Sequence, residues 1–401
     1  MNFFSIFPAL RNKNYQLYFT GQLVSLTGTW LQIIAQSWLV LQLTNSAFLI
    51  GLVAAIAALP TLLFAPFGGL IVDAFPRRKI LIFTQSAAMI LALILGFLTV
   101  IGVINVWEIA LLAFLLGVVT SIDIPARQAF AVELVGKKDL PSAISLNSGI
   151  FNGARVIGPS IAGFLIVLIG TGGAFIVNGL SYIAVIWALL QIRVVSLGHS
   201  THPNPFRAIQ AGISYSLAHP IIKILLIFTG MMSIFGWSAS VIMPVIAQNV
   251  FHVGAAGLGY LYAATGLGAI MATVAVSAFS QKISAKFFIL GGNVLFALAI
   301  TLFTLTSNLY IALIFLFISG FGLLSMFSMI NTTIQNHVED RFRGRVMSLY
   351  TIMFLGMTPL GSLQIGFLSE HFGTGFAIRV GALIVFIFGA WVFFSKKEMV
   401  L

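Results

Sequence analysis

Long apolar segments alternate with short polar connections along almost the whole chain, from Tyr15 to the last few residues. Most of these segments contain about 20 residues or more, the length that a helix needs to cross a ~30 Å hydrocarbon layer. None shows the alternation of apolar and polar residues over about ten positions that is typical of membrane-spanning strands. The pattern therefore predicts a chain of membrane-spanning helices.

Breaks at charged residues, glycines and prolines divide this pattern into twelve expected spans. Their expected limits are residues 16–43, 47–73, 80–103, 107–127, 142–169, 173–193, 219–249, 255–280, 287–306, 309–333, 345–369 and 374–395. The longest connection contains two histidines and two prolines and lies near the middle of the chain. We therefore expect an N-terminal six-helix half over residues 1–193, a cytoplasmic linker over residues 194–218 and a C-terminal six-helix half over residues 219–401.

A weak internal repeat supports this division. The segment LPSAISLNSGIFNGARVIGPSIAGFL, which starts at Leu140, can be aligned with GRVMSLYTIMFLGMTPLGSLQIGFL, which starts at Gly344. Residues 163–165 and residues 366–368 then coincide as Gly-Phe-Leu. Two repeated halves with a substrate path between them are typical of secondary transporters that rock between two states.

Composition agrees with a membrane protein, because 60% of the 401 residues are hydrophobic and only 7% are charged. A water-soluble chain of this length could not cover itself with a polar surface from so few charges. The first apolar segment is too long for the core of a cleaved signal peptide, so we expect it to remain as a span. The chain contains no cysteine, which excludes disulfides and thiolate metal sites.

The net charge of +11 follows the topology of the spans. Lys and Arg fall in alternate connections, whereas the intervening connections contain neither residue. This is the positive-inside pattern, and it places both termini in the cytoplasm. We therefore expect the lipid bilayer, and no nucleic acid, to be the partner of the basic residues.

The stretch GGLIVDAFPRRKI, residues 68–80, concentrates charge between the second and third spans. Its basic residues could simply anchor the topology. Asp73 adds nothing to such an anchor, because a carboxylate at a helix end near the interface needs a cationic partner or the N-terminus of a helix. Asp73 therefore indicates a function in addition to anchoring.

Gly69, Asp73, Arg77 and Arg78 resemble the loop between helices 2 and 3 of the major facilitator superfamily. That loop has a Gly, three residues, an Asp, a basic residue, any residue, a Gly and two basic residues. In the family it holds the two halves together in the outward-facing state. The resemblance implies an all-α integral membrane fold of twelve helices in two pseudo-symmetric halves, and the same gating role for Asp73, Arg77 and Arg78.

Two positions of the loop depart from the family pattern: Ala74 replaces a basic residue and Pro76 replaces the glycine. Asp123 and Arg127 lie four residues apart near the cytoplasmic end of the fourth span, a spacing that allows them to pair. The resemblance implies that Asp123 also joins the charged cluster of the loop with Asp73. We interpret this set as a gate, and not as a substrate site.

Two further stretches, SIDIPARQAFAVELV from Ser121 and DRFRGRVMSLY in the second half, resemble bacterial drug and siderophore exporters of the enterobactin and macrolide efflux type. NGARVIGPSIAG resembles the Gly-Pro motif on helix 5 of antiporters. Gly158 and Pro159 weaken the helix and Gly163 permits close packing, as expected of a pivot, although static membrane helices also contain Gly-Pro pairs. The resemblance implies export from a bacterial cell across the inner membrane by proton antiport. We expect a monomer without cofactor or metal.

Arg155 lies about 13 residues into the fifth span, roughly 20 Å along its axis and so near the middle of the membrane. An arginine at that depth must face protein or a water-filled cavity. It could bind an anionic substrate or couple conformations, or it could donate only to carbonyls of a neighbouring helix. Asn152, Gln32, Gln36 and Asn331 complete the candidate substrate or coupling residues.

Several alternatives stay open. Trp237 and Tyr262, with other aromatic residues, would suit a large aromatic substrate, but apolar residues of this kind are equally ordinary core. The only acids that could carry a proton are Glu108, Asp123 and Glu370, and all lie toward the membrane faces. No nucleophile or acid–base set gathers at one depth, which argues against an enzyme. An uptake transporter of the same fold, or a membrane sensor or scaffold that transports nothing, would share these features.

Overall fold

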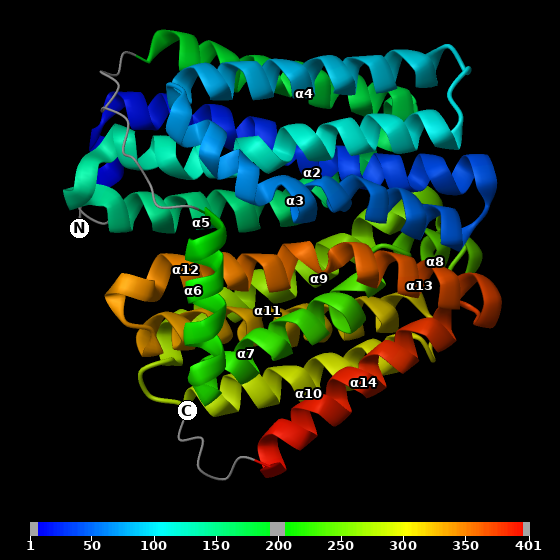
Figure 1. Ribbon diagram of the computed structural model, residues 1–401. Coiled ribbons are helices and arrows are strands. Elements are labelled where there is room, and N and C mark those ends of the chain that lie inside the picture. The colour runs from blue at the N-terminus through cyan, green and yellow to red at the C-terminus, as the bar shows by residue number, and fades with distance from the viewer. Residues whose placement is uncertain (1–6, 193–204, 396–401) are drawn as a thin grey trace. The chain divides into compact units, whose positions relative to one another are not determined.

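The computed structural model describes residues 7–192 and 205–395, and every regular element within these ranges is a helix (Figure 1). The elements of the first part are η1 (Pro8–Arg11), α2 (Lys13–Thr44), α3 (Ala47–Ala74), α4 (Arg77–Val100) and α5 (Val106–Gln191). The starts of α2 and α3 and the end of α3 lie within a few residues of the limits expected from the apolar pattern. The apolar pattern thus predicts these helices well.

α5 is three helices in succession. Its 86 residues would extend roughly 130 Å if they formed a single rod. Gly136 (φ 69°) and Gly170 (φ 73°) interrupt it in the left-handed region, where a residue without Cβ is favoured. They divide α5 into a first segment before residue 136, a second segment between residues 136 and 170, and a third segment after residue 170.

The second part of the chain begins with α6 and contains several short elements. These are α6 (Pro205–Ala218), α7 (Pro220–Met231), the π-turn η2 (Met232–Gly236), the 3-10 turn η3 (Trp237–Ser240), α8 (Met243–Asn249), α9 (Gly254–Phe279), α10 (Ala285–Phe303), α11 (Leu309–His337), α12 (Asp340–Thr351), the π-turn η4 (Ile352–Gly356), α13 (Thr358–Phe372) and α14 (Thr374–Ser395). The expected span over residues 219–249 corresponds to one candidate membrane crossing, Pro220–Asn249. A π-turn and a 3-10 turn interrupt the regular α-helix within this crossing. The mean hydropathy over a window of residues does not detect such turns.

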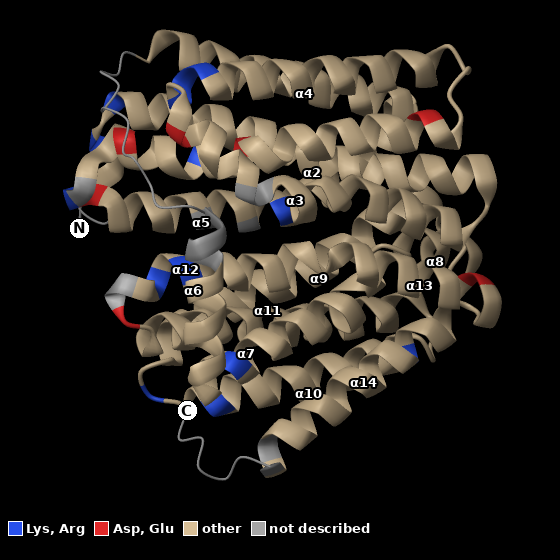
Figure 2. Ribbon diagram, in the orientation of Figure 1, with Lys and Arg blue, Asp and Glu red and all other residues tan. Residues whose placement is uncertain are grey.

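Within the described residues, eleven helices are long and apolar enough to cross a membrane. One of them, Lys138–Gln191, has 54 residues, about twice what one crossing requires, and the break at Gly170 divides it. The count is therefore consistent with the twelve expected spans. In each unit of the chain considered by itself, most Lys and Arg gather toward one end of the helices (Figure 2).

The chain forms two compact units. The first comprises residues 1–39 and 59–203, and the second comprises Val40–Ala58 and Asn204–Leu401. The end of α2 and the start of α3 thus belong to the second unit. Close packing explains this, because the Gly51 backbone lies against the Ser362 carbonyl and Gly366 of α13, and the Phe48 N–H donates to a Glu370 carboxylate oxygen at 3.2 Å.

The expected linker is partly helical. Residues 194–204 lie outside the described chain, whereas α6 occupies the remainder and packs on α12. The Tyr215 ring stacks on Phe342 with centroids 4.3 Å apart, and its hydroxyl accepts a hydrogen bond from the Glu339 N–H at 3.2 Å. The connection therefore contains a docked helix.

Candidate functional site

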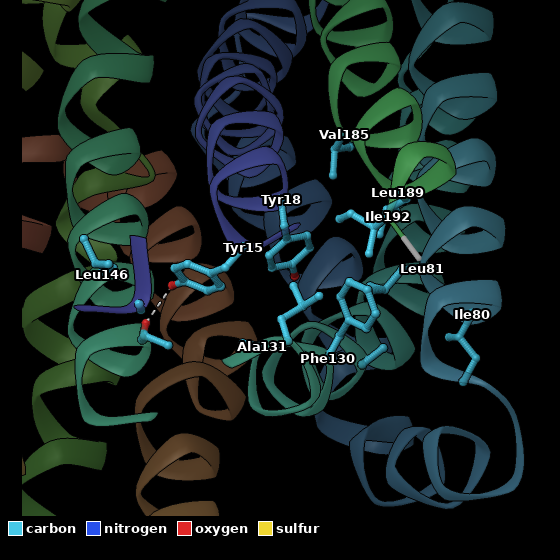
Figure 3. Packing of buried hydrophobic residues seen from close by; sticks show 14 of the residues in the cluster. Tyr15, Tyr18, Ile80, Leu81, Phe130, Ala131, Leu146, Val185, Leu189 and Ile192 are labelled. Atoms are coloured by element: carbon cyan, nitrogen blue, oxygen red, sulfur yellow. Dashed lines mark hydrogen bonds between the residues drawn. The ribbon is translucent and has the colours of Figure 1, made fainter. Parts of the chain in front are cut away.

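Aromatic packing fixes the beginning of α2 against α5. The rings of Tyr18 and Phe130 meet edge to face with centroids 5.3 Å apart, and the Tyr15 hydroxyl donates to the Ala143 carbonyl at 3.1 Å (Figure 3). All three aromatic side chains are buried. Since Phe130 belongs to the first segment of α5 and Ala143 to the second, α2 is held to both segments, and the polar groups beside this cluster have a rigid support.

Asp123 is the centre of a buried polar network. Arg127 Nε lies 2.7 Å from Asp123 Oδ2, so the predicted pair forms. Thr84 Oγ1 and Gln85 Nε2 both donate to Asp123 Oδ1, at 2.7 and 2.8 Å. Asp123 is only 5% exposed, and these three donors satisfy a carboxylate that would otherwise be costly to bury.

The network continues into α2. Ser25 Oγ donates to Gln85 Oε1 at 3.2 Å, and Arg127 Nη1 donates to Gln22 Oε1 at 3.4 Å. Gln22 Nε2 is buried and has no hydrogen-bond partner within the described ranges. The network therefore joins α2, α4 and the first segment of α5. Sequence reasoning missed Thr84, Gln85 and Ser25, although polar residues at matching depth on neighbouring spans could have indicated them.

The charged cluster implied by the family resemblance is not observed among the described residues. Arg77 Nη1 pairs with Glu133 Oε2 at 3.4 Å, and Asp73 has no ion-pair partner in the part of the chain that the structure describes. The position along α5 explains why Arg77 pairs with Glu133 and not with Asp123. Glu133 lies about 15 Å further along the helix than Asp123, which brings it level with Arg77 at the start of α4. Asp73 is half-buried at the end of α3, so a direct partner is not required. Glu133 is the acid that sequence reasoning missed.

Arg78 binds the end of the third segment of α5. Its Nε donates to the Leu189 carbonyl at 2.6 Å and its Nη2 donates to the Leu190 carbonyl at 2.9 Å. Carbonyls in the last turn of a helix have no partner within the helix, so Arg78 satisfies two of them. Close packing in this loop is at Gly68, whose backbone lies against the Ser121 carbonyl, whereas Gly69 has open space beside it.

The Gly-Pro element lies against α2. A Cβ on Gly158 would lie 2.6 Å from the Trp30 Cβ and 2.8 Å from the Thr27 carbonyl oxygen, distances that no side chain tolerates. Pro159 and Gly163 are buried as well. Close packing of this helix on α2 is therefore observed at Gly158, while its role as a pivot and the packing role of Gly163 stay predictions.

The remaining candidate polar residues have separate partners. Gln32 is buried and accepts a hydrogen bond of 2.5 Å from Asn178 Nδ2, while Gln36 and Arg155 are half-buried. In the second unit, Asn331 accepts from Gln335 Nε2 at 2.6 Å. The side chain of Asn152 lies outside the described part of the chain.

The two acids nearer the helix ends bind backbone N–H groups. Glu108 accepts from the Asn105 N–H at 3.0 Å in a capping box that begins α5. Glu370 accepts from the Phe48 N–H near the start of α3. Within residues 205–395 no ion pair joins Glu370 to Arg379, which donates instead to Thr304 Oγ1 at 3.3 Å. Both acids therefore have structural partners, whereas Asp123 is itself buried and is paired with the half-buried Arg127.

Sequence comparison decides the family. A model of the family described as transmembrane secretion effector matches residues 4–399. The chain belongs to the major facilitator superfamily. Superfamily members of this kind are transporters and not enzymes, in agreement with the scattered acids and histidines of the sequence.

Curated relatives in the superfamily cover most of the chain. The staphyloferrin A transporter of Staphylococcus aureus is 27% identical over 361 residues, which is 89% of each chain. The multidrug efflux pump Tap of Mycolicibacterium fortuitum is 25% identical and covers 86% of this chain and 87% of its own. The enterobactin exporter EntS of Escherichia coli is 22% identical and covers 88% of this chain and 84% of its own.

Solved structures of superfamily transporters share the fold. A bacterial homologue of the human lysosomal transporter Spinster, in an inward-facing and occupied conformation, aligns with a TM-score of 0.77 at 15% identity over 98% of both chains. The nucleoside transporter NupG aligns with a TM-score of 0.72 at 13% identity over 96% of this chain and 99% of its own. These likenesses concern the fold alone.

Proposed function

We propose that this superfamily member exports small organic molecules of the siderophore or hydrophobic drug class by proton antiport with alternating access. The observation that carries the proposal is the buried Asp123 and its ion pair with Arg127 within the first unit. Ionisable residues inside membrane-spanning segments are costly and mark substrate or proton pathways. Relatives that are named for siderophore transport, siderophore export and drug efflux support the substrate class and the direction.

Asp123 is the coupling acid in this proposal. Glu108 and Glu370 accept hydrogen bonds from backbone N–H groups at helix beginnings, which leaves Asp123 as the buried acid among the three candidates. Protonation of Asp123 would release Arg127, whose guanidinium then changes its hydrogen bonds to α2 through Gln22. The state of one acid would thereby change the packing of α2 on the first segment of α5.

Arg77, Arg78 and Asp73 act as the gate beside this coupling acid. Arg77 joins the start of α4 to Glu133 of α5, and Arg78 joins it to the end of the third segment. α4 is thus tied at its first residues to two segments of α5. A movement of the loop that contains Asp73 would be transmitted to α5 through these two arginines.

The proposed topology puts both termini in the cytoplasm of a bacterium, with the chain acting as a monomer in the inner membrane. The one-sided distribution of Lys and Arg in the connections supports it. Cysteine tags near Asn105 and near Lys138 can test it in the natural cysteine-free background. Labelling of both tags from the same side of the membrane would contradict the topology.

Export is tested in bacteria that lack their own drug and siderophore exporters. Cells that produce the wild-type protein should accumulate less of a transported siderophore or drug than cells with an empty vector, and a protonophore should remove the difference. The Asp123→Asn protein should behave like the vector, whereas Gly153→Ala, at a position with open space beside it, should behave like the wild type. Equal accumulation with and without protein would refute transport, and higher accumulation with it would indicate uptake.

A further inference from the structure

α6 is held in place by packing on its neighbours. Gly212, Tyr215 and Ser216 are buried, whereas Ile213 and Ser214 are exposed, so buried positions three and four residues apart define one face of the helix. α6 has only 14 residues, a length at which an isolated helix is marginal in water. It runs across α12 (Figure 1) and contacts mainly α12 and α7. Its helical state therefore depends on these contacts.

Stacked side chains form the contact with α12. The Tyr215 ring has the His219 ring on one face, with centroids 4.0 Å apart, and the Phe342 ring on the other, with centroids 4.3 Å apart. The Arg345 guanidinium lies 5.5 Å from the Phe342 centroid, within the range of a cation–π contact. Tyr215 is therefore the central ring of a stack that joins the end of α6 to the first two turns of α12.

Contacts with the backbone fix the orientation of α6. The Tyr215 hydroxyl accepts a hydrogen bond from the Glu339 N–H, directly before α12, at 3.2 Å. One turn earlier in α6, a Cβ on Gly212 would lie 3.1 Å from the Arg345 Cβ and 3.3 Å from the Arg345 carbonyl oxygen. α6 therefore touches α12 at two places along its length, which leaves little freedom for one helix to turn on the other.

The other end of α12 is joined to α13 through an irregular link. Pro359 has no N–H, so the Leu355 carbonyl lacks the donor that a regular helix would supply. Thr358 Oγ1 donates to that carbonyl at 2.5 Å, and Ser233 Oγ of η2 donates to the Phe354 carbonyl at 2.7 Å. Side-chain donors thus supplement the backbone in the π-turn η4. Prolines and π-turns are the usual positions at which helices bend.

We propose that α6 and α12 form one rigid lever that turns about η4 during transport, and that Tyr215 is the positioning residue that joins its two helices. The chain re-enters the second unit just before α6, so a displacement of the preceding chain reaches α12 through Tyr215 and bends the helix at η4. The connection between the halves then takes part in the movement. The inference rests on the proposed function, because it assigns a movement to the transport cycle.

Hydrogen exchange of the full-length protein in lipid nanodiscs tests the lever without relying on flux. Amides of α6 and α12 should exchange slowly and those of η4 faster. Tyr215→Ala should accelerate exchange in both α6 and α12 about tenfold, the factor by which loss of a stacked ring weakens a contact. Fast exchange of α6 in the wild-type protein, or an effect of Tyr215→Ala on α6 alone, would overturn the lever.

Two matched variants identify the part of Tyr215 that matters. Tyr215→Phe keeps the ring and should change exchange little. Leu217→Ala removes a side chain of α6 that is 58% exposed and should leave exchange unchanged. An equal effect of Leu217→Ala and Tyr215→Ala would contradict a specific contact at the stack.

A disulfide between the two helices separates docking from folding. The sequence contains no cysteine, and a Cβ on Gly212 would lie 3.1 Å from the Arg345 Cβ, near the ~3.5–4.5 Å spacing of disulfide Cβ atoms. In Tyr215→Ala protein that also carries Gly212→Cys and Arg345→Cys, oxidation should restore slow exchange, and dithiothreitol should reverse it. Both forms have the same sequence, so a general folding defect cannot explain the difference.

The same proteins test the movement by initial rates of ethidium flux in proteoliposomes with an imposed pH gradient. Tyr215→Ala should slow flux, and the oxidised disulfide should restore it. Loss of flux on oxidation, recovered with dithiothreitol, would overturn the lever, because α6 would then have to leave α12. If Tyr215→Ala does not yield folded protein, the disulfide in the otherwise unchanged chain decides, since its oxidised form should transport at least as fast as its reduced form.

Pro359→Ala tests the bend at η4. It restores an N–H for the Leu355 carbonyl, so exchange of η4 should slow and flux should decline while the midpoint of thermal unfolding stays near that of the wild type. Pro220→Ala at the start of α7 is the matched control, since no helical donor is missing there. Unchanged exchange and flux of Pro359→Ala would show that the helix does not turn at η4.

The two proposals fail in different ways. Wild-type protein that shows the expected exchange but transports no siderophore or drug would refute export and retain the joined helices. Flux together with fast exchange of α6 in the wild-type protein would refute the lever and retain export.

Discussion

Arg127 Nε lies 2.7 Å from Asp123 Oδ2, one helical turn away on the same face of α5. The carboxylate receives two further hydrogen bonds from α4, and the guanidinium donates one to α2. Because this pair makes hydrogen bonds within α5 and to α2 and α4, the loss of either charged residue should affect the packing of all three helices. The pair therefore connects the packing of α2 and α4 with that of the first segment of α5.

Removal of one member of this pair should affect both folding and transport. Asp123→Asn leaves the half-buried Arg127 beside a neutral amide, and the loss of one partner costs less than the roughly 3 to 5 kcal/mol of a fully buried pair. We expect a lower midpoint of thermal unfolding and no antiport. The double change Asp123→Asn with Arg127→Gln should recover most of the thermal stability without transport. Full antiport by the single Asn variant would show that Asp123 is not the coupling acid.

Asp73→Asn should abolish or greatly slow transport while leaving membrane insertion intact. The substitution keeps the size of the side chain and removes the charge that the gating loop requires by its resemblance to the family. Vesicle flux per amount of inserted protein is the measurement, with Lys79→Arg in the same stretch as the control, since Lys79 is exposed. Full flux from Asp73→Asn would show that Asp73 has no gating role and is only a residue at the membrane–water interface.

Arg78→Lys should slow transport although it conserves the charge. Lysine lacks the planar fork that allows Arg78 to donate to the Leu189 and Leu190 carbonyls together. The neighbouring change Lys79→Arg alters an exposed side chain and should have no effect. The comparison requires initial rates at equal protein amounts. Equal rates for the two variants would mean that charge alone matters at this end of α4.

Gly158→Ala should destabilise the contact between α2 and the second segment of α5. The added methyl group would overlap Trp30 and the Thr27 carbonyl, and overpacking of this kind typically costs about 1 to 3 kcal/mol. Gly153→Ala on the same segment is the matched control, since a Cβ there meets no atom within 4 Å. Thermal unfolding and flux should both decline for Gly158→Ala only. Similar behaviour of the two variants would contradict close packing at Gly158.

Arg155 provides a test of the candidate residue near mid-membrane. If Arg155 acts in transport, Arg155→Lys should impair flux and Arg155→Met should impair it further. The methionine variant should fold at least as well as the wild type, because it removes a costly charge. Flux and folded yield are measured on the same preparations. Normal flux with degradation of Arg155→Met would assign this residue to packing.

Much of the fold could be predicted, because the membrane imposes a single length on each span. α14 (Thr374–Ser395) coincides with its expected limits, and α9 (Gly254–Phe279) differs by one residue at each end. The interruption at η2 and η3 could not be predicted, since its residues are as apolar as those around them and its hydrogen bonds come from side chains such as Tyr262, far along the chain.

The candidate site was predicted only in part. The Asp123–Arg127 pair follows from helical periodicity, which is a local property. The pairing of Arg77 with Glu133 depends on the relative depth of α4 and α5, which the sequence does not encode locally. Resemblance to the family indicated Asp123 instead, at a position about three turns away. The sequence also cannot show which buried polar atoms lack a hydrogen-bond partner, as the Gln364 amide does among the described residues, because this depends on the positions of all neighbouring side chains.

The packing of Gly51 against Gly366 and the Ser362 carbonyl limits how the protein can be divided. A cut in the connection near residue 204 would give two fragments of six spans each, yet the C-terminal fragment would lack Val40–Ala58, which belongs to its compact unit. In this fragment the surface of α13 at Gly366 would be exposed, because the helix that packs against it, the start of α3, belongs to the other fragment. Fragment complementation and half-swapped chimaeras of this transporter should therefore succeed only when the partner fragment supplies a glycine-bearing start of α3.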